Sequence, residues 1–305
     1  MEKLNEGMRK IEKIYVIDEN SKNYPKQLLQ INNKPKKLYA LGNIKLLQNK
    51  AIAIVGTRNS TKYGELYAKK FASKISKTGI SIISGLALGI DSIAHKNSMK
   101  NIGKTIAVIG SGFNEIYPKE NTLLFKEILE NDGCIISEYP PEEKVNMANF
   151  PTRNRIIAGI SSGVLVVEAK HRSGSSITAR DAFKQKKPVF CIPNQLGIKT
   201  GVGTNNLIKI GAKLVTNVND ILVELGENIV EELEPEEIVK QTIVKQEYKK
   251  IYEILKKEPI NINQLAKITK EEIGKINQKL TMMEIEGLIE TLPANMVKRK
   301  EQNVL

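Results

Sequence analysis

Short apolar runs alternate with longer amphipathic segments from residue 51 to residue 215. Apolar runs with almost no polar position are typical of strands buried on both faces of a parallel sheet. They lie at 51–56, 80–83, 104–110, 134–137, 163–169, 188–192 and 212–215. The intervening segments predict helices at 62–78, 91–100, 121–131, 153–161, 176–186 and 204–210. This alternation predicts an α/β fold with a doubly wound, mostly parallel sheet.

Two further regions flank this pattern. Residues 24–43 predict a short helix and one additional strand of the same domain, which we bound at 24–225, after a short N-terminal segment, 1–23. Six glutamates crowd residues 227–237, so we predict a solvated linker over 226–245. The C-terminal part, 246–305, predicts a winged-helix domain, because three helices (246–257, 263–268 and 270–286) precede a hairpin around Pro293.

The charge is concentrated in the larger part of the chain. The whole chain has 47 basic and 34 acidic side chains, a net charge of +13. Residues 1–225 carry 34 basic and 19 acidic side chains (net +15), whereas residues 226–305 carry 13 and 15 (net −2). A phosphate-bearing partner would therefore meet the N-terminal part, although a general bias toward lysine accounts for some of this excess.

Several classes of protein do not fit the sequence. The apolar runs fall far short of the ~20 residues that span a bilayer, and the charged N-terminus lacks an export signal. We expect a cytosolic protein without a membrane span. Cys134 and Cys191 lie in apolar runs, which indicates buried reduced thiols. His95 and His171 are not spaced as metal ligands, so we expect no metal site.

Five loops rich in Gly, Ser and Thr follow predicted strands and would meet at one rim of the sheet: 56–58, 84–91, 110–121, 170–180 and 201–208. Small residues permit close backbone approach, and hydroxyls cap the following helices. Turn geometry alone would explain one such loop, but five together favour a crevice for phosphate.

Two nucleotide motifs are incomplete. Gly103-Lys104-Thr105 ends like a Walker A loop, but Ser98 stands where its first glycine should be. Gly110-Ser111-Gly112 starts like a dinucleotide fingerprint, but Glu115 replaces its third glycine. We therefore expect neither ATP hydrolysis nor a bound nicotinamide cofactor, and no cofactor of any kind.

Seven motifs, in this order along nearly the whole chain, resemble the DNA-processing protein A (DprA/Smf) family. They are VGTR (55–58), SGLALGIDSIAH (84–95), GSGFNEIYPKEN (110–121), SEYP (137–140), FPTRNRIIAGIS (150–161), SGSSITAR (173–180) and GTNNLI (203–208). The resemblance implies an extended Rossmann-like domain that binds single-stranded DNA and helps to load RecA recombinase during natural transformation. It also leads us to expect a homodimer and no enzymatic activity.

The expected DNA-binding residues lie in these motifs. Arg58 directly follows a buried strand and is the strongest candidate. Phe150 could stack on a base or pack in the core. Arg153 and Arg155 follow it, and we expect one of them to contact phosphate and the other to be structural. The rim supplies the remaining candidates: Gly110, Ser111, Gly112, Lys119, Lys170, Arg172, Ser173, Gly174 and Ser175.

Two alternatives remain open. Glu138 and Glu168 at strand ends could activate water in a Rossmann-like nucleotide hydrolase, but no Pro-Gly-Gly loop of such enzymes is present. Asp91 and His95 lack a nucleophile, so a helix cap and a structural hydrogen bond explain them better. A winged-helix transcription regulator would need a basic recognition helix, and residues 270–286 are not basic.

Overall fold

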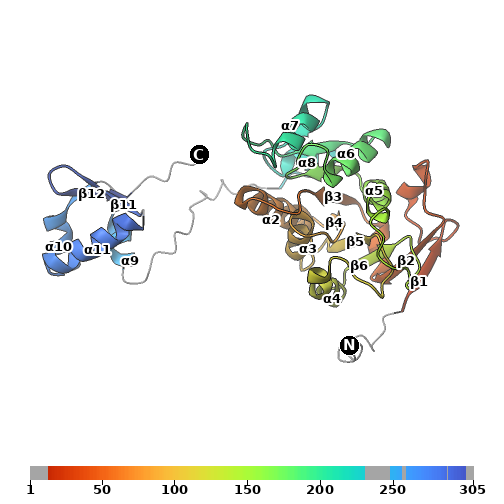
Figure 1. Cartoon of the computed structure of the whole chain (residues 1–305), viewed down its shortest axis with the longest axis horizontal. Helices are drawn as coiled ribbons and strands as arrows, with labels where there is room; N and C mark the ends of the chain where they lie inside the picture. The colour runs from red at the N-terminus through yellow and green to blue at the C-terminus, as the bar shows by residue number, and fades with distance from the viewer. Residues whose placement is uncertain (1–12, 231–247, 256–258, 287, 300–305) are drawn as a thin grey trace. The chain divides into compact units, whose positions relative to one another are not determined.

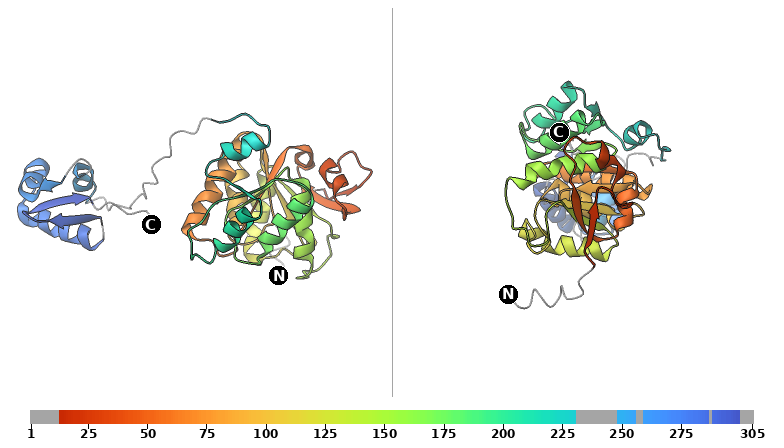
Figure 2. Two further views of the ribbon diagram at one scale, coloured as in Figure 1. Left: turned by 90° about the horizontal axis from the view of Figure 1, so that it is seen from above. Right: turned by 90° about the vertical axis from the view of Figure 1, so that its right-hand side faces the viewer.

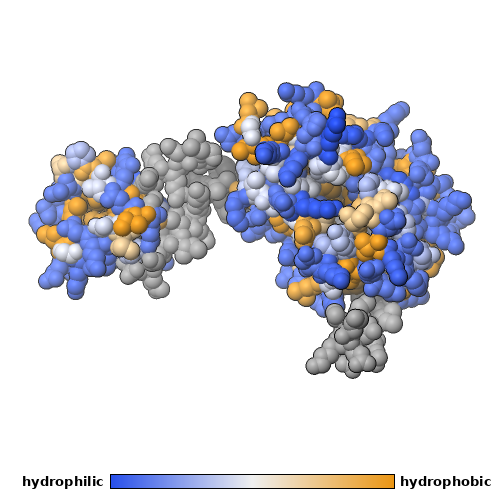
Figure 3. All heavy atoms as spheres, in the orientation of Figure 1, coloured by the Kyte–Doolittle hydropathy of each residue, from blue (hydrophilic) through white to orange (hydrophobic). Residues whose placement is uncertain are grey.

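The computed structural model describes residues 13–230, 248–255, 259–286 and 288–299 of the chain. These residues form two compact units, divided after Val230. Among the helices described, none is long and apolar enough to cross a bilayer. Polar side chains cover most of the face seen in Figure 3, and apolar side chains reach it as separate patches.

The large unit is built on one nine-stranded sheet with the order β1-β2-β6-β5-β4-β3-β7-β8-β9. From β6 to β9 all neighbours are parallel, whereas β1 and β2 join the β6 edge in antiparallel pairing. The strands are β1 (Tyr15–Asp18), β2 (Lys37–Gly42), β3 (Ala51–Val55), β4 (Ser81–Ser84), β5 (Thr105–Ile109), β6 (Cys134–Ser137), β7 (Val164–Val166), β8 (Val189–Cys191) and β9 (Lys213–Leu214).

Helices cover both faces of this sheet (Figures 1 and 2). They are η1 (Lys26–Gln30), η2 (Ile44–Gln48), α2 (Lys62–Lys77), α3 (Ile90–Ser98), η3 (Lys119–Asn121), α4 (Thr122–Glu130), α5 (Asn149–Ile160), α6 (Gly174–Lys184), α7 (Val202–Lys209) and α8 (Asn219–Glu224). Successive residues of β3 enter different cores: Ala53 packs with α5 and α6, and Ile54 packs with α2 and α3. This alternation explains why the strand has no polar position.

The strand order reverses between β3 and β7. The chain builds outward from β3 through β4 and β5 to β6, and α5 then carries it back to β7 on the other side of β3. Because β3 and β7 are parallel, with Val55 opposite Val166, their carboxyl ends lie side by side. In doubly wound sheets this switch point is where the loops diverge and leave a crevice for a ligand.

The predicted doubly wound α/β fold is confirmed, and all seven predicted parallel strands occur. Four elements were missed: the edge strand β1, the short helices η2 and η3, and helix α8. Pairing of β1 with β2 places residues before Tyr24 in the large unit. At its other end, Val230 exchanges two hydrogen bonds with Asn219, so the unit also extends past residue 225. Most of the predicted linker lies outside the described residues.

The small unit has the predicted winged-helix architecture. Helices α9 (Lys249–Ile254), α10 (Ile262–Thr269) and α11 (Ile273–Ile285) pack on a three-stranded sheet of β10 (Ile260–Asn261), β12 (Met296–Arg299) and β11 (Ile289–Leu292). Lys270 adopts a left-handed conformation that ends α10, so α11 begins three residues later than predicted. Ile276, Leu280 and Met283 form its buried face.

Candidate nucleic-acid interface

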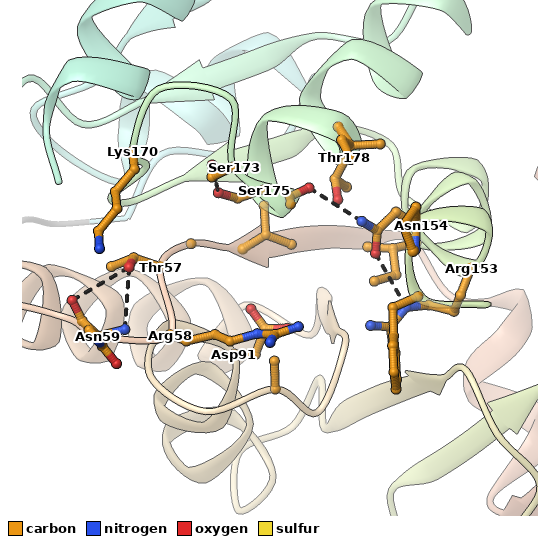
Figure 4. A pocket seen from close by; sticks show the side chains of 18 of the residues that line it. Thr57, Arg58, Asn59, Asp91, Arg153, Asn154, Lys170, Ser173, Ser175 and Thr178 are labelled. Atoms are coloured by element: carbon orange, nitrogen blue, oxygen red, sulfur yellow. Dashed lines mark hydrogen bonds between the residues drawn. The ribbon is translucent and has the colours of Figure 1, made fainter. Parts of the chain in front are cut away.

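A pocket with a volume of about 500 Å³ opens at the switch point between β3 and β7 (Figure 4). The loop after β3, the loop after β7 and the first turns of α5 and α6 form its walls. Its polar and charged lining residues are Thr57, Arg58, Asn59, Asp91, Arg153, Asn154, Lys170, Ser173, Ser175 and Thr178. The volume lies within the range of roughly 300–1,000 Å³ that is usual for small-molecule sites.

Arg58 enters the pocket from the loop after β3 and extends across it toward Arg153 (Figure 4). A close approach between two loops fixes its backbone, because Ile90 donates a hydrogen bond to the Thr57 carbonyl at 3.2 Å. Gly89 permits this contact: its φ is +75°, and a Cβ there would lie 2.6 Å from the Arg58 carbonyl oxygen. The Arg58 side chain is exposed and has no hydrogen-bond or ion-pair partner among the described residues.

Lys170 enters the pocket from the opposite loop, after β7 (Figure 4). A glycine again allows the supporting contact, since Gly203 donates to the Ala169 carbonyl at 2.7 Å, and a Cβ on Gly203 would meet the Lys170 carbonyl oxygen at 2.6 Å. In the described part of the chain Lys170 is likewise exposed and unpaired. Two free cations therefore face one hollow.

Two helix N-termini add partial positive charge to the same pocket. Helix α6 begins at Gly174 and has no acidic residue in its first turn, and Ser173 caps it by accepting a hydrogen bond from Ser176 N. Helix α5 begins at Asn149, with Pro151 in its first turn, where a missing N–H costs nothing. The unpaired N–H groups of such turns favour anions.

Phe150 stands at the edge of the pocket and is half-buried. Its ring lies 5.3 Å from the Tyr117 ring, centroid to centroid, and a Cβ on Gly110 would meet it at 2.9 Å. One part of the ring is therefore packed, while another part lines the pocket. The Phe150 ring is therefore placed both to stack on a base and to pack against its neighbours, so the two predicted roles are combined.

Arg153 is a buried cation that organises the pocket floor. Its side chain is 5% exposed and donates to the carbonyls of Gly85 (2.8 Å) and Val108, which joins α5 to the ends of β4 and β5. Burial lowers the pKa of Arg153 to about 10, while nearby Asp91 opposes this shift and Arg58 adds to it. Burial also disfavours the charged form of Asp91 and therefore raises its pKa. The Asp91 carboxylate accepts a hydrogen bond from Gly85 N at 3.0 Å.

Arg155 lies outside the pocket and is held by protein contacts. It forms an ion pair with Glu138 at 2.6 Å and donates to the Asn33 carbonyl at 2.8 Å. These contacts tie α5 to the loop after β6 and to the N-terminal extension. Of the two arginines that were predicted to divide the roles, Arg155 therefore has the structural position and Arg153 lines the pocket.

Five other predicted site residues do not line the pocket. The Ser111 hydroxyl donates to the Glu115 carbonyl, and a Cβ on Gly112 would collide with the carbonyls of Pro140 and Pro141. This loop is folded against its neighbours. Lys119 and Arg172 are exposed and unpaired among the described residues, beyond the lining of the pocket. The five residues are Gly110, Ser111, Gly112, Lys119 and Arg172.

The carboxylates considered for water activation have other partners. Glu168 is fully buried and accepts two hydrogen bonds from Thr61, the N-cap of α2, at 2.9 and 2.6 Å, as well as one from Thr200. It therefore serves to hold the start of that helix.

His95 is also fully buried. It shares a 2.7 Å hydrogen bond with Thr105, and burial lowers its pKa to about 3. A neutral structural histidine fits this environment.

Sequence reasoning interpreted Asp91 only as a helix cap, and it missed four further polar residues of the pocket: Thr57, Asn59, Asn154 and Thr178. Thr57 and Asn59 flank Arg58, and the rule that strand-end residues face the crevice could have found them. Asn154 and Thr178 lie inside helices, where the local pattern gives no such sign. Within the described residues, no group of three or more His, Cys, Asp and Glu side chains could hold a metal ion.

The fold and the pocket define a Rossmann-like protein with a basic site suited to an anionic ligand, joined in one chain to a winged-helix unit. The chain belongs to the DNA recombination-mediator protein A family, whose model matches residues 15–226. The model of the DprA winged helix domain matches residues 240–295. The predicted family is thereby confirmed.

Relatives extend over most of the large unit. The DNA processing protein DprA of Bacillus subtilis is 43% identical over 223 residues, 73% of this chain and 75% of its own. Protein Smf of Escherichia coli is 42% identical over 69% of this chain, but the match spans only 56% of the E. coli protein.

Two solved structures show the same fold. DprA of Streptococcus pneumoniae is 40% identical with a TM-score of 0.66, and the match covers 72% of this chain and 77% of that one. DprA of Helicobacter pylori, described in terms of its single-stranded DNA binding mode, is 34% identical with a TM-score of 0.64, covering 70% and 96%. This chain is thus a relative of DNA-processing proteins.

Proposed function

We propose that this protein binds single-stranded DNA in the pocket between β3 and β7, and that it acts as a recombination mediator. One observation carries the proposal: Arg58 and Lys170, which are exposed and have no partner within the described part of the chain, face one pocket beside the half-buried ring of Phe150. Cations for phosphate and an aromatic ring for a base are the two components of single-strand binding. The description of the H. pylori relative supports this ligand.

The shape of the site favours a single strand over a duplex. A recessed pocket can receive a nucleotide whose base is free, whereas the bases of a duplex are stacked inside the double helix. Contacts through arginine, lysine and backbone N–H groups carry little base specificity. Affinity should therefore depend on phosphate and fall as salt rises, with little preference among bases.

The role is one of binding rather than catalysis. Glu168 accepts hydrogen bonds from Thr61, the N-cap of α2, and Glu138 is paired with Arg155, so both carboxylates of the hydrolase alternative have structural partners. The transcription-regulator alternative would place duplex DNA on α11. Its exposed side chains include one cation, Lys275, which the exposed Glu284 balances, besides uncharged residues such as Gln278. The helix therefore offers little attraction for a polyanion.

The wider role follows from the family. We propose that the bound strand is DNA taken up during natural transformation, that binding protects it, and that RecA is then loaded onto it. This role belongs in the cytosol, where recombination with the chromosome takes place. A homodimer is part of the same proposal, and light scattering of the purified chain tests it.

The decisive experiment is a fluorescence anisotropy titration that compares labelled oligo(dT) with a duplex of equal length over a series of salt concentrations. We expect tighter binding of the single strand and a log–log slope of about −0.7 per phosphate neutralised. Equal affinity for the duplex, or a complex insensitive to salt, would contradict the proposal. RecA nucleation on the same oligonucleotide, with and without this protein, tests the mediator role separately.

A further inference from the structure

Phe150 separates the main pocket from a second, smaller hollow with a volume of about 60 Å³. The two hollows share Arg58, Ala87, Phe150 and Arg153 in their walls. On its far side the second hollow is lined by Leu88, Tyr117 and Pro118. Arg58 therefore stands between two depressions in the surface, with Phe150 as their common wall.

Beside its two arginines, the second hollow has an apolar and aromatic wall that remains partly open to solvent. The side chains of Tyr117 and Leu88 are each 37% exposed. The Tyr117 ring is tilted by 37° from the Phe150 ring, and among the described residues its hydroxyl has no hydrogen-bond partner. No carboxylate is among the residues that line this hollow in the described part of the chain. An open aromatic surface beside a cation suits a base attached to phosphate.

We propose that Tyr117 and Leu88 form a second nucleobase subsite. The base of one nucleotide occupies the main pocket, the base of the next stacks on Tyr117, and the phosphate that links them lies against Arg58. This inference rests on the proposed function and extends it: the strand crosses Phe150 from the β3–β7 crevice toward the loop after β5. Lys119, exposed two residues beyond Tyr117, would then lie near the continuing backbone.

An alternative role for Tyr117 is to support the Phe150 ring from behind. In that case its removal would disturb every contact of Phe150, whichever nucleotide is present beside it. If Tyr117 forms a base subsite, its removal should weaken binding only of strands that carry a base at that position. Oligonucleotides with and without bases therefore separate the two roles.

The test uses the full chain and two oligomers of equal length. One is thymidine throughout, and the other is abasic deoxyribose phosphate with a single thymidine, so that it can place a base in the main pocket but none on Tyr117. Tyr117→Leu should weaken binding of the thymidine oligomer about fivefold or more. It should leave binding of the mainly abasic oligomer within about twofold. Tyr117→Phe, which keeps the ring, should bind like the wild type.

Tyr63→Leu is a matched control, because Tyr63 is 39% exposed and lines neither hollow. If Tyr117→Leu does not fold, Leu88→Ser removes the opposite wall without touching the ring pair, and the same selective loss is expected from it. 2-Aminopurine within the oligomer gives a direct signal: its fluorescence should be quenched by the wild type and less so by Tyr117→Leu.

Failure of this inference can be distinguished from failure of the proposed function. Equal losses on both oligomers, or no loss on either while Arg58→Ala weakens binding, would overturn the subsite and leave the main pocket in place. If the wild type binds neither oligomer, or if Arg58→Ala changes nothing, the proposed function itself fails and the subsite fails with it.

Discussion

Replacing Arg58 by alanine removes one free cation from the pocket and should weaken binding of single-stranded DNA. A hydrogen bond between charged partners contributes about 1–3 kcal/mol, which corresponds to about 5- to 150-fold in affinity. Because the side chain is exposed, solvent screens its charge and the loss should lie toward the lower end of this range at physiological salt.

The structure also predicts how Arg58→Ala should affect folding. Arg58 has no hydrogen-bond or ion-pair partner among the described residues, so its removal breaks no polar contact within that part of the chain. Its charge lowers the pKa of Arg153, which means that the two guanidinium groups repel each other. The free energy of unfolding should therefore change by less than about 0.5 kcal/mol, the usual size of a surface substitution, and the change should be in the stabilising direction.

The measurement is anisotropy of labelled oligo(dT) over a salt series, together with urea denaturation of each variant. Losing one phosphate contact should reduce the magnitude of the log–log salt slope by about 0.7. Lys96→Ala is the charge-matched control, because Lys96 is exposed in the last turn of α3, at the end away from the pocket. Wild-type affinity in Arg58→Ala, or an equal loss in Lys96→Ala, would refute the reasoning.

Changes at Phe150, at the winged-helix unit and at His95 test three other parts of the structure. Phe150→Ala should cost ~1–3 kcal/mol of binding if the ring stacks on a base, measured by the same titration, and a larger loss of stability in urea would assign it to packing. Truncation after Val230 should keep the large unit folded by circular dichroism and leave oligo(dT) affinity within about threefold (~0.65 kcal/mol), whereas a tenfold loss would place the winged helix on DNA. His95 has a pKa of about 3 in the folded state and ~6.5 in the unfolded state. Its contribution to stability is therefore complete above about pH 6.5 and decreases as the pH falls, because the unfolded state takes up the proton first. In urea unfolding at several pH values, His95→Gln should flatten this acid dependence, and an unchanged profile would contradict the prediction.

The large features of the fold could be predicted because the local pattern determines them. Strands such as β3 carry no polar residue, since both faces are covered by helices, and this uniform burial is visible in the sequence. The convergence of Arg58, Lys170 and Ser173 also follows from a general rule, because the carboxyl ends of parallel strands share one rim. No knowledge of individual contacts is needed for either inference.

Residue roles were less predictable, because they depend on contacts between distant parts of the chain. Arg153 and Arg155 are two residues apart in one motif, yet only Arg155 meets Glu138 and the Asn33 carbonyl. The loop at Gly112 looks suited to phosphate, but it closes against Pro140 and Pro141. A pattern of residue types predicts the rim, whereas tertiary packing decides which of its groups remain free.

The contrast between the two pocket arginines explains how the site can be both ordered and available. Arg153 is desolvated, and it is stabilised by backbone carbonyls and by the nearby carboxylate of Asp91, so its position is determined by the fold. Arg58 shares its neighbourhood but has no ion-pair partner among the described residues, and its charge opposes that of Arg153. A phosphate at Arg58 would supply the missing negative charge. It would be attracted by both guanidinium groups, while only the exposed one has to give up solvent, so the buried arginine adds attraction at little further desolvation cost.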